Sequence, residues 1–161
     1  GNQEIMNEFE EVFFSTTFGG ETLSLAASIA TINEIRENDV MEHLRTQGKK
    51  LQDSYNSSAA EHQLQNATSC EGLPGKSAIQ FADFENQQGM IMKILVQQSL
   101  TKQGILFNGE HMLSASHSDN DIDRTIQAYG NALATLANAV ENDSVLDQLE
   151  GPPLEVIIRP R

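Results

Sequence analysis

The chain has 161 residues, 39% of them hydrophobic, and its 23 acidic and 10 basic side chains give a formal net charge of −13. This excess of negative charge disfavours nucleic acid as a partner, because the phosphate backbone would be repelled. The apolar runs are shorter than the roughly 20 residues that a membrane-spanning helix needs. The single cysteine, Cys70, excludes an internal disulfide and fits a reducing compartment. Composition therefore predicts a cytoplasmic globular protein with neither nucleic-acid nor membrane partners.

Helices are expected over most of the first third of the chain. Residues 3–10 read as a short helix, followed by an extended piece at 12–15. A second helix is expected from Glu21, because apolar residues recur at spacings of four and three. Asp39 and Glu42 resemble a capping box that would start a third helix, long and amphipathic. The apolar stripe of the second helix consists of Leu25, Ile29, Ile32 and Ile35.

The rest of the chain alternates strands and helices. Short apolar runs bounded by glycine and proline predict strands, and apolar residues three and four positions apart predict helices. The expected elements are two strands within 68–83, a helix at 86–101, strands at 105–107 and 112–115 around an Asn108–Gly109 turn, a helix from Ser118 to about Val140 and an edge strand at 154–158.

The last helix has the clearest pattern. Ser118 followed by Asp121 is typical of a helix N-cap. The apolar residues that follow span too few heptads for a coiled coil, so we expect this seam to pack as core against the small sheet. The seam consists of Ile122, Ile126, Tyr129, Leu133, Leu136 and Val140.

This order of elements predicts the α+β class, with a small, mostly antiparallel sheet, helices packed on one face of it, and a long helix before it. We expect one domain covering residues 1–161. Within it, a lead-in segment with a phosphate-type loop is expected at 1–20, helices at 21–65, a small α+β subdomain at 66–150 and a tail at 151–161.

The bend at residues 15–20 is the one local feature that suggests a binding site. The four histidines are scattered and no cysteine or histidine pair has metal-ligand spacing, so no metal site is predicted. Residues 72–77 end like a phosphate loop but lack its spacing. In the bend, hydroxyls and two glycines come directly before a helix, where backbone N–H groups favour anions such as phosphate. A plain capped turn explains the same residues, and both interpretations stay open.

Three segments, in the right order and spacing, resemble the class III (subgroup II) pyridoxal-phosphate-dependent aminotransferases, and within them the glutamate-1-semialdehyde aminomutase-like branch. They are FFSTTFGGETLSLAASIATINEI at 13–35, GLPGKSAIQF at 72–81 and GILFNGEHMLSASHSDNDIDRTIQAYGNAL at 104–133. The resemblance extends over about residues 1–142. It implies the C-terminal small domain of a fold-type I enzyme.

The resemblance implies that the catalytic lysine lies upstream of this chain, so no residue here is expected to be catalytic. The full-length homodimer would move an amino group through a pyridoxamine intermediate, on a small amino-acid or amino-aldehyde substrate, with pyridoxal 5′-phosphate as cofactor. By itself the chain is expected to be inactive and to hold no cofactor. The alternative is a non-catalytic interaction or dimerisation domain that retains the fold.

The resemblance also implies binding residues. Thr17 matches the threonine that binds the cofactor phosphate in the neighbouring subunit's site, and Thr16 beside it offers a backbone N–H. Many members follow that threonine with Ser-Gly-Asn-Pro, whereas this chain has Gly-Gly-Glu-Thr at 19–22.

On the substrate side the resemblance implies Glu110 and His111, although an exposed hairpin turn explains them equally well. The aminomutase usually has Phe-Glu-Ala-Gly where this chain has Asn-Gly-Glu-His at 108–111, which favours a related aminotransferase. His117 is expected to brace the start of the last helix.

Overall fold

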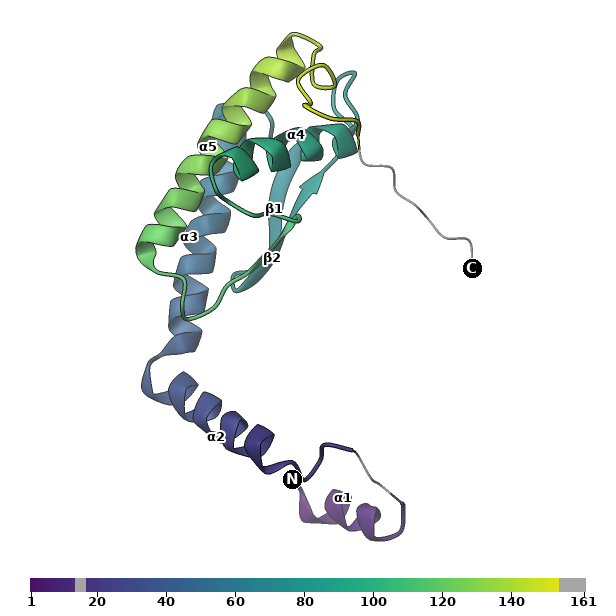
Figure 1. Cartoon of the computed structure of the whole chain (residues 1–161), viewed down its shortest axis with the longest axis vertical. Helices are drawn as coiled ribbons and strands as arrows, with labels where there is room; N and C mark the ends of the chain where they lie inside the picture. The colour runs from purple at the N-terminus through teal and green to yellow at the C-terminus, as the bar shows by residue number, and fades with distance from the viewer. Residues whose placement is uncertain (14–16, 154–161) are drawn as a thin grey trace. The chain divides into compact units, whose positions relative to one another are not determined.

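The computed structural model describes residues 1–13 and 17–153 (Figure 1). It divides into two compact units, Gly1–Val40 and Met41–Arg161. Of the sequence-based expectations, the edge strand at 154–158 lies outside the described residues, and so does half of the extended piece at 12–15. The expected single domain with its four segments stays a prediction.

The described part of the first unit contains two α-helices, α1 (Gln3–Asn7) and α2 (Thr22–Glu37), with a 3₁₀ turn, η1 (Glu8–Glu10), directly after α1. Both predicted helices are therefore confirmed. The side chain of Asn2 caps α1 by accepting a hydrogen bond from the backbone N–H of Glu4 at 2.9 Å. Neither α-helix buries a residue within the structure.

The apolar stripe of α2 is on its surface. Its four residues have the spacing that predicted the helix, yet between 37% and 61% of each is exposed. A helix of 16 residues without packing is marginal in water, because its backbone hydrogen bonds barely offset the entropy of ordering the chain. The pattern therefore predicted the helix correctly without showing what covers it.

The start of the long helix α3 (Val40–Glu61) differs from the prediction. Asp39 has a positive φ of 47°, whereas an N-cap residue has an extended backbone. Its left-handed conformation instead follows Asn38, the C-cap of α2, and is typical of a helix end. Glu42 pairs with Arg45 at 2.5 Å on the surface rather than completing a capping box. The helix also ends at Glu61, before the predicted residue 65.

Within the described residues of the second unit lies a three-stranded antiparallel sheet in the order β1-β2-β3. Strands β1 (Thr68–Leu73) and β2 (Lys76–Phe81) form the hairpin expected around the Gly-Leu-Pro turn, with Cys70 opposite Ile79. Helices α4 (Gly89–Lys102) and α5 (Asp119–Glu141) follow in the chain and, with α3, run beside the sheet (Figure 1). The predicted α+β class with a small antiparallel sheet is confirmed.

The third strand is displaced from its predicted position. Residues 105–107 form no strand, and β3 covers Glu110–Met112 instead of 112–115. The backbone of the first segment is occupied by α4: the Ile105 N–H donates to the Leu100 carbonyl, and the Gln97 amide donates to the Phe107 carbonyl. These groups are therefore not available to a sheet.

The seam of α5 packs mainly along α4 rather than on the sheet as predicted. Between its large apolar residues it places alanines, Ala128, Ala132 and Ala139, which are buried and let the two helices approach closely. Each large side chain in this core contributes roughly 1.5–3 kcal/mol through burial. The fully buried large side chains are Tyr55, Tyr129, Leu51, Leu64, Met92, Leu95, Leu100, Ile122, Leu133, Leu136, Val96 and Val145.

Side chains of α3 cover the backbone of strand β1. The Asn56 amide accepts from the Cys70 N–H at 2.7 Å and donates to the Cys70 carbonyl at 3.0 Å. Gln52, one turn earlier, donates to the Gly72 carbonyl at 3.0 Å. An uncovered strand edge is a template for pairing with other chains. These amides therefore fasten α3 to the sheet and satisfy its free edge.

Asn56→Ala is expected to destabilise the chain by about 1–2 kcal/mol, because it leaves a donor and an acceptor of Cys70 without their protein partner. Gln52→Ala removes a single bond and should cost less than half as much. Urea unfolding followed by circular dichroism would compare the two variants. Equal losses would contradict a special role for Asn56.

Candidate functional site

The described part of the bend before α2 is an open turn. Residues 17–20 are all exposed, and the Glu21 N–H donates to the Phe18 carbonyl at 3.1 Å. A Cβ added at Gly20 would meet nothing within 4 Å, so the space beside the bend is free. Thr17 is thus accessible to a ligand, while Thr16 lies outside the described residues.

The N-terminus of α2 already holds a negative group. Glu21 is the N-cap residue, and its carboxylate accepts from the Leu23 and Ser24 N–H groups at 2.9 and 2.6 Å. The hydrogen bonds from Ser24, and then that from Leu23, lower the pKa of Glu21. An external anion would therefore be held by the Thr17 hydroxyl and the bend's backbone, not by the first helical donors. These donors alone do not form a phosphate site. They fit a phosphate only as part of a site to which other residues contribute.

The two substrate-side residues expected from the sequence have opposite environments. Glu110 is exposed at the start of β3, where its N–H donates to the Asn108 side chain at 3.0 Å. His111 is only 7% exposed and points into the core. Of the two, Glu110 is therefore free to meet a ligand, and substrate contact by either residue stays a prediction.

His111 is the centre of a buried hydrogen-bond network. Its Nδ1 lies 2.9 Å from the Ser77 Oγ, and its Nε2 lies 2.5 Å from the Tyr129 hydroxyl. The Cys70 Sγ is 3.7 Å from the same Nδ1. Burial lowers the pKa of His111 from 6.5 to about 4, so the ring is neutral near pH 7. One ring nitrogen then donates and the other accepts, which ties β3 to both β2 and α5.

A second polar pair extends this network toward α3. The Tyr55 hydroxyl lies 2.7 Å from the Thr68 Oγ1, which in turn donates to the Gln80 carbonyl. The Tyr55 and Tyr129 rings pack edge to face, with centroids 5.1 Å apart. Sequence reasoning missed this network. Alternation along β2, which turns Ser77 inward, could have indicated it, but the pairing with β3 could not be known.

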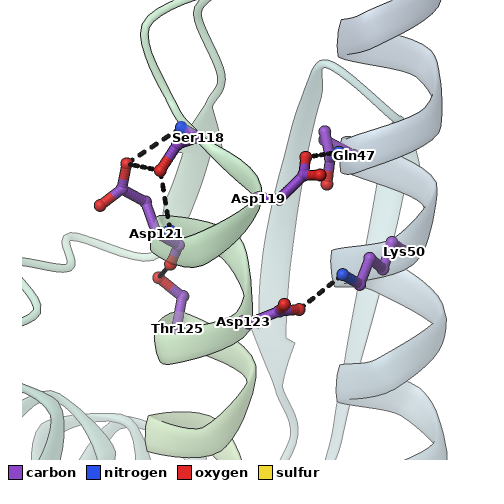
Figure 2. Close-up of polar contacts among 7 residues, drawn as sticks. All are labelled: Gln47, Lys50, Ser118, Asp119, Asp121, Asp123 and Thr125. Atoms are coloured by element: carbon purple, nitrogen blue, oxygen red, sulfur yellow. Dashed lines mark hydrogen bonds and ion pairs between the residues drawn. The ribbon is translucent and has the colours of Figure 1, made fainter.

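The start of α5 is fixed at the predicted N-cap, Ser118, which forms a capping box with Asp121. Ser118 Oγ accepts from the Asp121 N–H, and the Asp121 carboxylate accepts from the Ser118 N–H (Figure 2). Figure 2 also shows α5 joined to α3 through two side-chain pairs, Gln47 with Asp119 and Lys50 with Asp123, each at 2.5 Å. The helix therefore begins at a fixed point beside the β3 segment.

His117 braces this start, as predicted. Its Nδ1 accepts from the Ser114 N–H at 3.0 Å, and its own carbonyl lies 3.1 Å from the His43 Nε2 on α3. The segment between β3 and α5 is thus held at both ends.

A hollow of about 590 Å³ opens between the 104–113 segment and the first turns of α5. It lies entirely within the second unit, and its walls include both Glu110 and His111. Among the described residues, no group of three or more His, Cys, Asp or Glu side chains could hold a metal ion. The described helices also include none that is long and apolar enough to cross a membrane.

The fold is that of part of a pyridoxal-phosphate-dependent transaminase. It matches the structure of the PLP internal aldimine form of the FumI protein from Sphingopyxis sp. MTA144 with a TM-score of 0.73 and 22% identity, covering 88% of this chain and 33% of that one. An ω-transaminase from Sphaerobacter thermophilus matches with a TM-score of 0.68 and 17% identity, covering 84% and 34%.

In sequence the chain is similar to part of two glutamate-1-semialdehyde 2,1-aminomutases. That of Halobacterium salinarum (strain ATCC 29341 / DSM 671 / R1) is 35% identical over 65 residues, 38% of this chain and 15% of the aminomutase. That of Halorubrum lacusprofundi (strain ATCC 49239 / DSM 5036 / JCM 8891 / ACAM 34) is 41% identical over 56 residues, 33% and 13% of the two proteins. No protein-family profile matches the chain.

These findings confirm the resemblance to part of a class III pyridoxal-phosphate-dependent aminotransferase. The chain spans about a third of the solved transaminases and at most 15% of either aminomutase in the matched region.

Proposed function

We propose that the chain forms the C-terminal part of a pyridoxal-phosphate-dependent class III aminotransferase, similar to glutamate-1-semialdehyde aminomutase. The whole enzyme would act in the cytoplasm as a homodimer on a small amino acid or amino-aldehyde. The partial sequence match to two aminomutases and the fold shared with two transaminases support this class. Asn108–His111, which differs from the aminomutase pattern, favours an aminotransferase over the aminomutase itself.

The single observation that carries the proposal is the accessibility of Thr17 on an open bend. Its hydroxyl would donate to the cofactor phosphate in the partner subunit's site, with the backbone N–H of Thr16 beside it. Bound pyridoxal phosphate supplies the electron sink for moving an amino group. The residue that binds it covalently is a lysine outside this chain, so the chain alone would be inactive and hold no cofactor. Glu110, exposed on the second unit, would face the substrate side.

Thr17→Ala in the full-length protein is expected to weaken cofactor binding about tenfold to a hundredfold, because a hydrogen bond to a charged group is worth about 1.5–3 kcal/mol. Thr17→Ser keeps the hydroxyl and should retain most of the affinity. Dialysis of the holoenzyme, followed by visible absorbance of the retained cofactor, measures the loss.

Thr31→Ala is the matched control, since that hydroxyl lies on α2, the helix that follows the bend, and donates to the Ala27 carbonyl. If Thr17→Ala retains cofactor as well as the Thr31 variant does, the assignment of Thr17 is wrong.

The second candidate is a non-catalytic interaction or dimerisation domain that keeps the fold. The exposed apolar stripe of α2 favours it, because such a surface needs a covering partner. The sequence encoded upstream of Gly1 separates the two. An in-frame domain with a lysine after a strand supports the enzyme, and a nearby start codon supports the interaction domain.

A further inference from the structure

The hollow beside β3 is lined at its base by buried, mainly apolar side chains. Ile122 and Leu51 are 2% exposed, and the rings of Phe107, His111 and Tyr129 pack against one another with centroids 5.7 to 6.0 Å apart. The hydroxyl of Tyr129 and both ring nitrogens of His111 are engaged with protein partners. A ligand would thus meet an apolar surface there. The volume of about 590 Å³ is typical of small-molecule sites.

The charged groups of this hollow are Glu110, Asp121 and Arg124. Asp121 is bound to Ser118 in the capping box and is also attracted by the Arg124 charge. Glu110 makes no ion pair within the described part of the chain. Of the two carboxylates that line the hollow, that of Glu110 is therefore the one that no hydrogen bond or ion pair engages within the described residues.

Two further ionisable side chains, His117 and Lys93, lie near Glu110 without forming an ion pair with it. His117 accepts a hydrogen bond from the Ser114 N–H at Nδ1. Lys93 of α4 reaches the backbone at Gly109, 2.8 Å from where a Cβ would stand, without forming an ion pair with Glu110. The net charge of −13 adds a field that concentrates cations near the surface.

We propose that this hollow binds a small organic cation with a compact apolar body, such as a trimethylammonium compound. Its alkyl groups would cover the base of the hollow around Phe107 and Ile122, and its charge would lie beside Glu110. The site belongs to the second unit alone and does not involve Thr17, but it shares Glu110 with the substrate side of the proposed aminotransferase.

Three probes of nearly equal shape test the proposal on the full 161-residue chain. Choline carries the cation, 3,3-dimethyl-1-butanol is its uncharged counterpart, and 3,3-dimethylbutanoate carries a negative charge. Amide chemical shifts of Glu110 and Arg124 in NMR titrations report binding. We expect choline to bind about fivefold more tightly than the alcohol, since an exposed charge pair at 4 Å is worth about 1 kcal/mol in water. The carboxylate should bind most weakly.

Charge-removing variants give results of opposite sign. Glu110→Gln should abolish the preference for choline over the alcohol, whereas Arg124→Gln should strengthen choline binding two- to fivefold. Glu61→Gln, on an exposed residue at the end of α3 that does not line the hollow, should change neither. Absence of binding, equal binding of choline and the alcohol, or weaker choline binding in Arg124→Gln would overturn the proposal. Cofactor retention in Thr17 variants does not involve this hollow, so the two proposals fail independently.

Discussion

Replacing Gly48 with alanine is expected to destabilise the chain by about 3 kcal/mol, through a clash between α3 and the β1–β2 turn. A Cβ at Gly48 would lie 1.8 Å from the carbonyl oxygen of Pro74 and 2.2 Å from its carbonyl carbon. Both are backbone atoms, so relief requires the helix or the hairpin to move. Because Asn56 and Gln52 fasten the same helix to β1, such a movement also strains those hydrogen bonds.

Gly130→Ala is the matched control for this substitution. Gly130 also lies inside a long helix, α5, but a Cβ there would meet nothing within 4 Å. Alanine favours a helix interior over glycine by about 1 kcal/mol, so this variant should be more stable than the parent. Urea unfolding curves of both variants measure the difference. A stability change of the same sign in the two would contradict the close contact at Pro74.

Gly48 illustrates why part of the fold could not be predicted from sequence. The pattern from Val40 to Tyr55 is that of an ordinary amphipathic helix. A glycine within it suggests only a position of low helix propensity. Glycine is required at this position because of Pro74. That residue lies in the β1–β2 turn and contacts α3 only after the hairpin has formed. By contrast, α5 was predicted closely because the Ser118 cap and the apolar spacing are local properties of the chain.

The candidate site likewise combines features that could be predicted from local sequence with features that depend on contacts between distant residues. The sequence indicated the bend at Thr17 as a candidate binding feature, and the described part of that bend is exposed. It did not predict that Glu21 would cap α2, because glutamate is not among the preferred N-cap residues. Likewise, His111 was selected by its place in a motif, yet its burial results from pairing of β3 with β2 and packing of Tyr129.

Acid is expected to destabilise the chain through His111. The pKa of this side chain is about 4 in the folded state, against an ordinary value of 6.5 that the unfolded chain regains. The unfolded state therefore takes up the proton first as the pH falls. The contribution of His111 to stability is complete above about pH 6.5, declines from there to about pH 4, and totals about 3 kcal/mol.

Because the unfolded state binds this proton more tightly than the folded state, the free energy of unfolding is expected to fall by about 1 kcal/mol between about pH 7 and pH 5.5. The other ionisable groups of the network do not titrate in that interval, since burial raises the pKa of Cys70 and of Tyr129. His111→Gln removes the titrating ring, keeps an amide able to donate and accept, and should flatten the pH dependence while lowering stability overall.

His62→Gln provides the comparison, because His62 lies just beyond the end of α3 and is half-buried outside this network. Urea unfolding of the parent and both variants across that pH interval measures the three slopes. We expect the parent and the His62 variant to lose stability in parallel while the His111 variant stays level. If the His111 variant keeps the parent's slope, protonation of the buried ring is not the cause, and the network tolerates acid without opening.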